Sequence, residues 1–301
     1  MKKILCIHPG VAYLPEIEAY KKYFMRYDIE FIDCVKDLNN KFDETKYDIL
    51  WYMMGFYFKK NNKPKVHDYA SLSTGKYPFI KDMIKKFFNV KPNLRLFLND
   101  SIKNIYKFND NVPYLIRDMG VDEIFFKDYN IVKKYDFVYV GSIAPERKTS
   151  VLLRKFAQEL KNYTLLVIGK VPYEIYKNYR SVDNIIFTGK VDYKEVPQMA
   201  LQAKYAINMV PDIYPFNIQT STKLLEYCAL NLKVITTSYK WVNEFEDRYN
   251  ARFFKVNENL DNFDIKKIEF FDFKIPDVKE LEWNKIFDRI KLFENIQGLL
   301  Y

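Results

Sequence analysis

Short apolar segments alternate with helical segments along most of this 301-residue chain, and this alternation constrains the fold more than any other feature. Strands are predicted at 3–8, 29–34, 47–54, 94–98, 137–140, 165–168, 185–187, 205–209 and 233–236. Helical spacing occurs at 15–27, 79–88, 102–108, 150–160, 196–204 and 220–229. Because strands that alternate with helices form a parallel sheet with helices on both faces, the sequence predicts an α/β fold. Ligands of such sheets bind beyond the carboxyl ends of the strands.

Composition indicates a folded chain and excludes several classes of protein. Apolar residues make up 49% of the sequence, and no apolar run approaches the roughly 20 residues of a membrane span. The short apolar run near the start ends in a Pro-Gly turn, so we expect a first strand there and not a signal peptide. Cys6, Cys34 and Cys228 lie far apart in apolar segments, which indicates buried thiols in a reducing cytoplasm. With only two histidines in the chain, we expect no metal site.

Two interruptions of the alternation divide the chain into parts. Residues 129–135 are polar enough for a linker, so we expect one domain at 1–130 and a second at 136–280. The stretch 255–280 breaks the strand and helix pattern. Amphipathic spacing then returns, which predicts a final helix at 281–301.

One motif carries the most specific chemistry. Residues 220–229 read Thr-Ser-Thr-Lys-Leu-Leu-Glu-Tyr-Cys-Ala, and Thr or Ser before an apolar run signals a helix N-terminus. A first turn containing Ser221, Thr222 and Lys223 would offer backbone N–H groups and a positive dipole end to a phosphate. Glu226, one turn further, can accept hydrogen bonds from two vicinal hydroxyls such as those of a ribose. These groups together suit a sugar nucleotide. The alternative is an ordinary amphipathic helix with Glu226 as a solvated charge.

The motif resembles the donor site of GT-B-fold glycosyltransferases, in the broad group of family 1 and family 4 enzymes, which reads roughly K-L-L-E-Y-x-A-x-x-x-x-V-I-x-T. The resemblance is best over residues 136–245. It implies two Rossmann-like domains facing a central cleft. The N-terminal domain would bind the acceptor and the C-terminal domain the nucleotide sugar, with the last helix crossing back onto the N-terminal domain.

The loop after the strand 137–140 resembles the first loop of the family's C-terminal domain. Gly141 and Ser142 stand where the backbone would approach the diphosphate. The resemblance implies that Arg147 or Lys148 balances the diphosphate charge. The alternative is two solvated charges at the start of a helix, an arrangement that the helix dipole disfavours.

Two further strand ends resemble those that flank the nucleotide base in the family. Gly169 ends one of them, and the backbone of Gly189, Lys190 and Val191 would contact the base after the other. The donor would be a UDP-, GDP- or dTDP-sugar, with no essential cofactor. Many retaining members carry a second Glu at the position of Ile218, so its absence leaves the stereochemistry open.

The N-terminal half carries no equally specific motif, yet an inverting transfer needs a general base. His67 and Asp68 lie in a segment that we expect to end a strand, and Asp100 follows the strand 94–98. For His67 and Asp68 a structural role is the alternative, and for Asp100 it is capping of the next helix. His8, at the end of the first strand, is the other candidate, or it belongs to a phosphate-binding loop.

The positive charge of the chain is concentrated in one stretch. Residues 59–107 contain twelve Lys or Arg and three acidic residues, 12 − 3 = +9, which equals the net charge of the whole chain. Aromatic residues at 56–58 and 87–88 are interleaved with these charges. The combination suits an anionic lipid surface, and with less weight nucleic acid. The alternative is a solvated basic face.

These patterns predict a glycosyltransferase of the hexosyl-transferring class. We expect a saccharide or lipid-linked saccharide acceptor, a role in cell-surface polysaccharide assembly, and a cytoplasmic or peripheral location at the inner face of the membrane. Two alternatives stay open: a DNA-modifying glucosyltransferase of the phage type, and a non-catalytic GT-B-like subunit.

Overall fold

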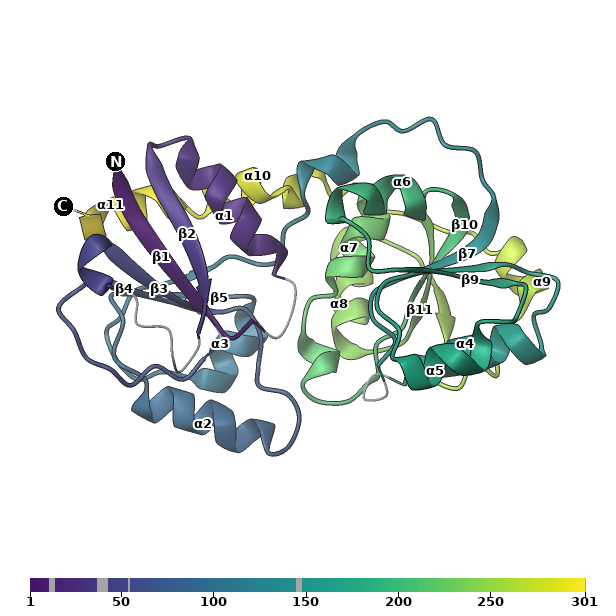
Figure 1. Cartoon of the computed structure of the whole chain (residues 1–301), viewed down its shortest axis with the longest axis horizontal. Helices are drawn as coiled ribbons and strands as arrows, with labels where there is room; N and C mark the ends of the chain where they lie inside the picture. The colour runs from purple at the N-terminus through teal and green to yellow at the C-terminus, as the bar shows by residue number, and fades with distance from the viewer. Residues whose placement is uncertain (11–13, 37–42, 54, 145–147, 301) are drawn as a thin grey trace. The chain divides into compact units, whose positions relative to one another are not determined.

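The computed structural model (Figure 1) describes residues 1–10, 14–36, 43–53, 55–144 and 148–300. The chain divides into two compact units, an N-terminal unit of Met1–Asp122, Ile218–Thr220 and Glu280–Tyr301, and a C-terminal unit of Glu123–Asn217 and Ser221–Lys279. The boundary falls at Asp122, ahead of the linker expected at 129–135. The C-terminal unit begins there because Phe125 is buried in it, with its ring centroid 5.4 Å from that of Tyr193.

The sheet of the N-terminal unit has six parallel strands in the order β2-β1-β3-β4-β5-β6. They are β1 (Lys2–His8), β2 (Ile29–Val35), β3 (Ile49–Met53), β4 (Lys65–Tyr69), β5 (Leu94–Phe97) and β6 (Tyr114–Ile116). Helices α1 (Pro15–Met25), α2 (Pro78–Phe88) and α3 (Asp100–Tyr106) lie between the strands in the chain. The strand order reverses between β1 and β3, so the topological switch point of this sheet lies there.

The sheet of the C-terminal unit is also parallel and six-stranded, in the order β12-β11-β10-β7-β8-β9. Its strands are β7 (Tyr135–Val140), β8 (Leu165–Ile168), β9 (Ile185–Gly189), β10 (Ala203–Asn208), β11 (Lys233–Thr237) and β12 (Phe254–Val256). Its helices are α4 (Ser150–Gln158), α5 (Tyr173–Tyr179), α6 (Val196–Ala200), α7 (Thr222–Ala229), α8 (Lys240–Tyr249) and α9 (Ile265–Glu269). This is the Rossmann strand order, with the switch point between β7 and β10. The predicted α/β fold with two Rossmann-like units is confirmed.

The end of the chain returns to the N-terminal unit, as expected, but as two helices instead of one. These are α10 (Trp283–Arg289) and α11 (Leu292–Leu300), and Lys291 between them has a left-handed φ of 52° that ends the first helix. Phe287 stacks on Tyr20 of α1 with ring centroids 4.8 Å apart, and Phe293 stacks on Tyr27 at 3.8 Å. Both ends of the chain therefore build the core of one unit.

Candidate donor site and the N-terminal candidates

Three glycines lie at the carboxyl ends of neighbouring strands in the C-terminal sheet. Gly141 follows β7, Gly169 follows β8 and Gly189 ends β9, with φ values of 129°, 143° and 71°. A Cβ atom on Gly169 would lie 2.4 Å from the carbonyl oxygen of Gly141, so no larger residue fits at this position. We call this row the glycine edge. Its lack of side chains lets a ligand approach the backbone closely.

Lys223 in the first turn of α7 lies over the glycine edge. Its Nζ atom is 3.1 Å from the hydroxyl of Tyr139 and 4.5 Å from the centroid of that ring. A Cβ atom on Gly141 would lie 3.4 Å from the same Nζ atom. A cation and an open backbone thus meet at the switch point, which is an arrangement suited to a phosphate group.

The N-terminus of α7 is fixed by a buried hydrogen-bond network. Ser221 is the N-cap, accepting from the backbone N–H of Leu224 at 3.4 Å, and the prediction of a helix start here is confirmed. The Ser221 hydroxyl also donates to Oδ1 of Asn208 at 2.9 Å. The amide of Asn208 in turn donates to Thr236 at 3.0 Å and to Tyr239 at 3.1 Å. Ser221, which precedes the first helical residue Thr222, is therefore connected to the ends of β10 and β11.

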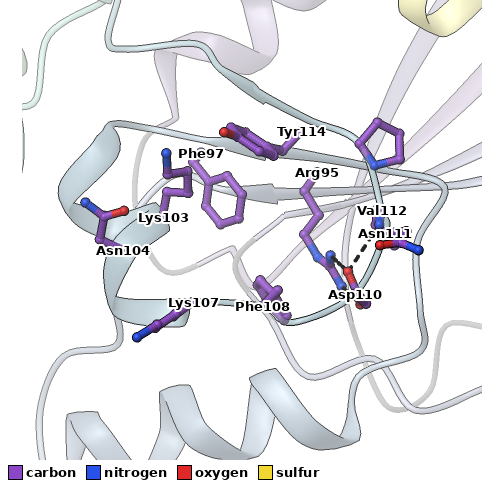
Figure 2. Close-up of a pocket in the computed structure, with 11 residues that line it drawn as sticks. Arg95, Phe97, Lys103, Asn104, Lys107, Phe108, Asp110, Asn111, Val112 and Tyr114 are labelled. Carbon is purple, nitrogen blue, oxygen red and sulfur yellow. Dashed lines mark hydrogen bonds and ion pairs between the residues drawn. The ribbon is translucent and has the colours of Figure 1, made fainter.

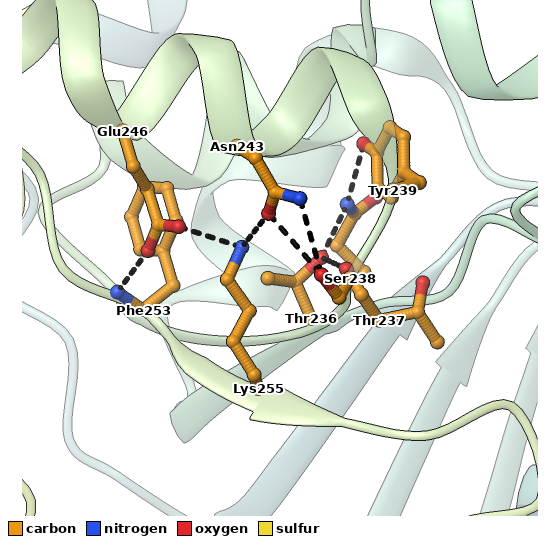
Figure 3. Close-up of polar contacts among 9 residues, drawn as sticks. Thr236, Thr237, Ser238, Tyr239, Asn243, Glu246, Phe253 and Lys255 are labelled. Atoms are coloured by element: carbon orange, nitrogen blue, oxygen red, sulfur yellow. Dashed lines mark hydrogen bonds and ion pairs between the residues drawn. The ribbon is translucent and has the colours of Figure 1, made fainter.

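A second polar cluster holds the turn that follows β11 (Figure 3). Nζ of Lys255 lies 2.7 Å from Glu246 and 3.2 Å from Asn243, and Asn243 pairs with Ser238. Burial lowers the pKa of the Lys255 ammonium. The cluster ties α8 to β12 and so supports the turn that carries Tyr239.

Glu226 is held inside the unit and is not a solvated charge. Only 5% of it is exposed, and the hydroxyl of Tyr193 donates to its Oε1 atom at 2.7 Å. The next residue, Tyr227, accepts a hydrogen bond from the backbone N–H of Val140 at 2.8 Å. These contacts fix α7 against β7 and give the Glu226 carboxylate a defined position one turn beyond Lys223.

The other predicted donor residues are placed differently. Nζ of Lys148 lies 2.7 Å from Glu258, whose other oxygen accepts from the N–H of Asp212, so the charge of Lys148 is already balanced. Arg147 lies outside the described residues. Ser142 follows Gly141, Lys190 is exposed directly after β9, and Val191 is half-buried. Tyr193, Asn208 and Tyr139 were not predicted; only Asn208, a polar residue ending an apolar strand, carries a signal in the sequence.

His67 and Asp68 lie in the middle of β4 and not at a strand end, which corrects the prediction. His67 is buried with Nδ1 3.4 Å from the hydroxyl of Tyr69, and burial lowers its pKa to about 3. Asp68 accepts from Nε of Arg117 at 3.1 Å and from the hydroxyl of Tyr20 at 2.8 Å. Both side chains are built into the core, so neither is placed to meet a substrate.

Asp100, a candidate general base with helix capping as the alternative, is not the N-cap of α3. Asn99 is the N-cap of α3 and accepts from the N–H of Ile102 at 3.0 Å. Asp100 is the first residue of the helix, largely exposed, with its carboxylate 3.1 Å from Nζ of Lys103. The sequence did not distinguish the two positions because Asn99 and Asp100 are adjacent and both are good capping residues.

His8 is the histidine that lies at a carboxyl strand end. It ends β1 beside the switch point of the N-terminal sheet, with Nε2 3.2 Å from Oδ2 of Asp33. The backbone N–H of Gly10 donates to Nδ1 at 3.2 Å. Asp33 also pairs with Lys21 at 2.7 Å. His8 thus has a carboxylate partner and lies where ligands bind in parallel sheets.

A separate hollow of about 970 Å³ lies beside α3 and the edge strand β6 (Figure 2). Phe97, Phe108 and Tyr114 form its aromatic wall, and the guanidinium of Arg95 lies 3.7 Å from the centroid of Phe108. Arg95 is paired with Asp110 at 2.5 and 2.8 Å. The segment 107–113 that closes the hollow leads into the amino end of β6, so we assign the hollow no part in catalysis.

Neither a metal cluster nor a membrane-spanning helix is found in the described part of the chain. No group of three or more His, Cys, Asp or Glu side chains among residues 1–10, 14–36, 43–53, 55–144 and 148–300 is close enough to hold a metal ion. Within the same ranges, every helix is too short or too polar to cross a bilayer.

Comparison with known proteins agrees with this geometry. Residues 134–264, somewhat less than half of the chain, match the family described as "Glycosyl transferases group 1". This region contains the glycine edge, α7 and their supporting contacts. No curated protein sequence gives a significant match.

Solved structures are similar over the whole chain. Anabaena Alr3699/HepE, in complex with UDP and glucose, is 12% identical with a TM-score of 0.63, covering 99% of this chain and 98% of that one. Sucrose-phosphate synthase from Thermosynechococcus elongatus is 12% identical with a TM-score of 0.64, covering 100% and 96%. The phage T4 β-glucosyltransferase is 16% identical with a TM-score of 0.51, covering 99% and 97%. The fold shared with these structures is GT-B, and the C-terminal part of the chain, residues 134–264, is similar to the group 1 glycosyl transferases.

Proposed function

We propose that this enzyme moves a sugar from a nucleotide-activated donor to a saccharide or lipid-linked saccharide in the assembly of a cell-surface polysaccharide. The proposal of a nucleotide-sugar donor rests on one observation: Lys223 lies over the glycine edge, and the Glu226 carboxylate lies one turn further along α7. The diphosphate lies against Gly141 and Lys223, and the ribose hydroxyls donate to Glu226. A fixed cation and a helix N-terminus stabilise the departing diphosphate, so no metal is needed.

A UDP-sugar is the first donor to test, because the Anabaena structure of the same fold holds UDP and glucose. GDP- and dTDP-sugars are the alternatives. The side chains described above do not select the nucleobase of the donor, since Gly189, Lys190 and Val191 would contact it through backbone groups.

For an inverting transfer, we propose His8 as the general base in place of His67, Asp68 and Asp100. His8 ends β1 at the switch point, and Asp33 is placed to orient its ring and to stabilise the imidazolium after proton transfer. Substrate binding must free one ring nitrogen, because Gly10 and Asp33 contact both in this structure.

Thermal unfolding with UDP-, GDP- and dTDP-sugars, followed by release of nucleoside diphosphate, tests this function. The true donor raises the melting temperature through linkage. His8→Asn should lower the turnover rate about 100-fold or more, the usual contribution of a general base, and leave the donor-induced shift intact. His67→Asn is the matched control, and turnover per folded molecule should be unchanged.

The two alternatives give different results in the same experiment. A non-catalytic subunit would bind a donor and release no diphosphate in the presence of any acceptor. A DNA-modifying enzyme would release it only with duplex DNA as acceptor. The basic N-terminal half, with +9 in residues 59–107, supports a cytoplasmic enzyme that works at the inner membrane face on a lipid-linked acceptor.

A further inference from the structure

Helix α2 presents its aromatic side chains to solvent, whereas two of its charged side chains, those of Asp82 and Lys85, face the interior. Asp82 and Lys85 are only 4% and 6% exposed, whereas Phe79, Ile80 and Phe87 are 63%, 54% and 64% exposed. A surface helix of a globular protein ordinarily has its apolar stripe against the core. The inversion indicates that another apolar medium covers the outer stripe of α2.

Contacts on the inner side fix the rotation of the helix about its axis. Asp82 accepts from the N–H of Ser73 at 3.1 Å and from the hydroxyl of Tyr106 at 2.9 Å. Nζ of Lys85 lies 2.8 Å from the hydroxyl of Ser73 and 3.6 Å from Asp82. Turning the aromatic stripe inward would break these buried bonds and leave charges without partners. The outward stripe is therefore part of the fold.

The outer stripe is continuous and is bordered by cations. Phe79, Met83 and Phe87 are spaced four residues apart and so share one side of the helix. We call the following residues the α2 face: Lys76, Tyr77, Phe79, Ile80, Lys81, Met83, Lys86, Phe87 and Phe88. Its aromatic and aliphatic members are all exposed. Lys59, Lys60 and Lys91 are further exposed cations in the same basic stretch.

We infer that the α2 face docks onto an anionic lipid bilayer, with its rings and aliphatic side chains among the headgroups and its lysines on the lipid phosphates. An apolar stripe flanked by cations on a helix too short to span the bilayer is the pattern of a helix lying in the membrane interface. The phosphates of duplex DNA could bind the lysines, but DNA offers no apolar environment in which Ile80 and Met83 could be buried. The biological setting rests on the proposed lipid-linked acceptor, whereas docking itself requires no donor.

Sedimentation of the full chain with vesicles tests this inference. Wild type should bind vesicles containing phosphatidylglycerol, bind phosphatidylcholine vesicles poorly, and release as salt shortens the Debye length. The variant Phe79→Ser, Met83→Ser, Phe87→Ser should lose at least tenfold in vesicle affinity, and so should Lys76→Glu, Lys81→Glu, Lys86→Glu. Lys85 is left unchanged because its ammonium is part of the buried pair.

Matched changes on the C-terminal unit serve as controls. Phe270→Ser removes an aromatic side chain that is 89% exposed, and Lys177→Glu, Lys240→Glu, Lys266→Glu gives the same change in charge. Both should bind vesicles like wild type. The inference is overturned if the α2 variants bind as tightly as the controls, or if wild type ignores anionic vesicles at low salt and binds duplex DNA instead.

Donor-induced thermal shifts separate this inference from the proposed function. The α2 variants should keep the wild-type shift, which also shows that they are folded. A wild-type chain that binds anionic vesicles but no nucleotide sugar would contradict the proposed function and leave the docking intact.

Discussion

At the scale of single residues, the donor site depends on which cation is available for phosphate. Among the described contacts of Lys223, its ammonium lies beside the hydroxyl and the ring of Tyr139. The Nζ atom of Lys148, in contrast, lies 2.7 Å from a carboxylate oxygen of Glu258. An ammonium that already has a carboxylate partner gains less from a phosphate, because it must exchange one anion for another. Lys223 is therefore the better phosphate ligand.

Replacing Lys223 by Ala should weaken binding of the nucleoside diphosphate by about 1.5–3 kcal/mol, the range for hydrogen bonds to charged groups. Binding of the uncharged nucleoside should change little, since it carries no phosphate. Lys148→Ala is the matched control and should have the smaller effect. Calorimetric titration with both ligands checks this, and equal losses for nucleoside and diphosphate would show that Lys223 is only structural.

The sequence contains Lys223, Gly141 and Glu226 within recognisable local patterns, so these could be predicted. The Glu258 partner of Lys148 is 110 residues away, and no local pattern reveals it. The contact between Tyr193 and Glu226 could not be predicted either, because these residues are 33 positions apart in the sequence.

At the scale of elements, apolar periodicity located most strands and helices but failed where polar side chains are buried. Strand β4 reads Lys-Val-His-Asp-Tyr, and all five residues are buried. Lys65 donates to the backbone carbonyls of Asn61 and Lys63, and Asp68 accepts from Tyr20 and Arg117, which local sequence does not show. The helical spacing at 79–88 predicted α2 correctly, but the orientation of the helix depends on tertiary contacts of Asp82 and Lys85.

Buried His67 gives β4 a testable dependence on pH. Its folded pKa of about 3 lies below the unfolded value of about 6.5, mainly because burial disfavours the charged ring. Between these values the unfolded chain binds a proton that the folded chain does not, so stability falls as the pH drops below about 6.5.

As the pH falls from about 6 to about 4, the unfolding free energy of wild type should therefore decrease relative to that of His67→Gln. The decrease should be up to about 1.4 kcal/mol per pH unit. Denaturant unfolding of the two proteins at several pH values measures this difference, in which the other titrating groups cancel. A difference that does not change with pH would mean that His67 is protonated in the folded protein.

At the scale of the whole molecule, the residues proposed for donor binding and those proposed for catalysis and membrane docking belong to different Rossmann-like units. The C-terminal unit carries the glycine edge, Lys223 and Glu226, and the N-terminal unit carries His8 and the α2 face. The parallel pairing of strands in each sheet followed from the alternation of elements, and the return of α10 and α11 to the N-terminal unit followed from the family resemblance. The break at Lys291 did not, because a left-handed lysine has no sequence signature.

The central claim is that the site beside α7 binds a nucleotide sugar, and calorimetric titration of UDP-glucose into wild type and Glu226→Gln tests it most directly. Gln keeps an acceptor for Tyr193 but removes the charge that the ribose hydroxyls would meet. We expect saturable binding by wild type and a loss of at least about 1.4 kcal/mol, a factor of ten, in Glu226→Gln. If UDP-glucose, GDP-glucose and dTDP-glucose all fail to bind, or the donor that binds does so equally in both proteins, the donor site is not where this account places it.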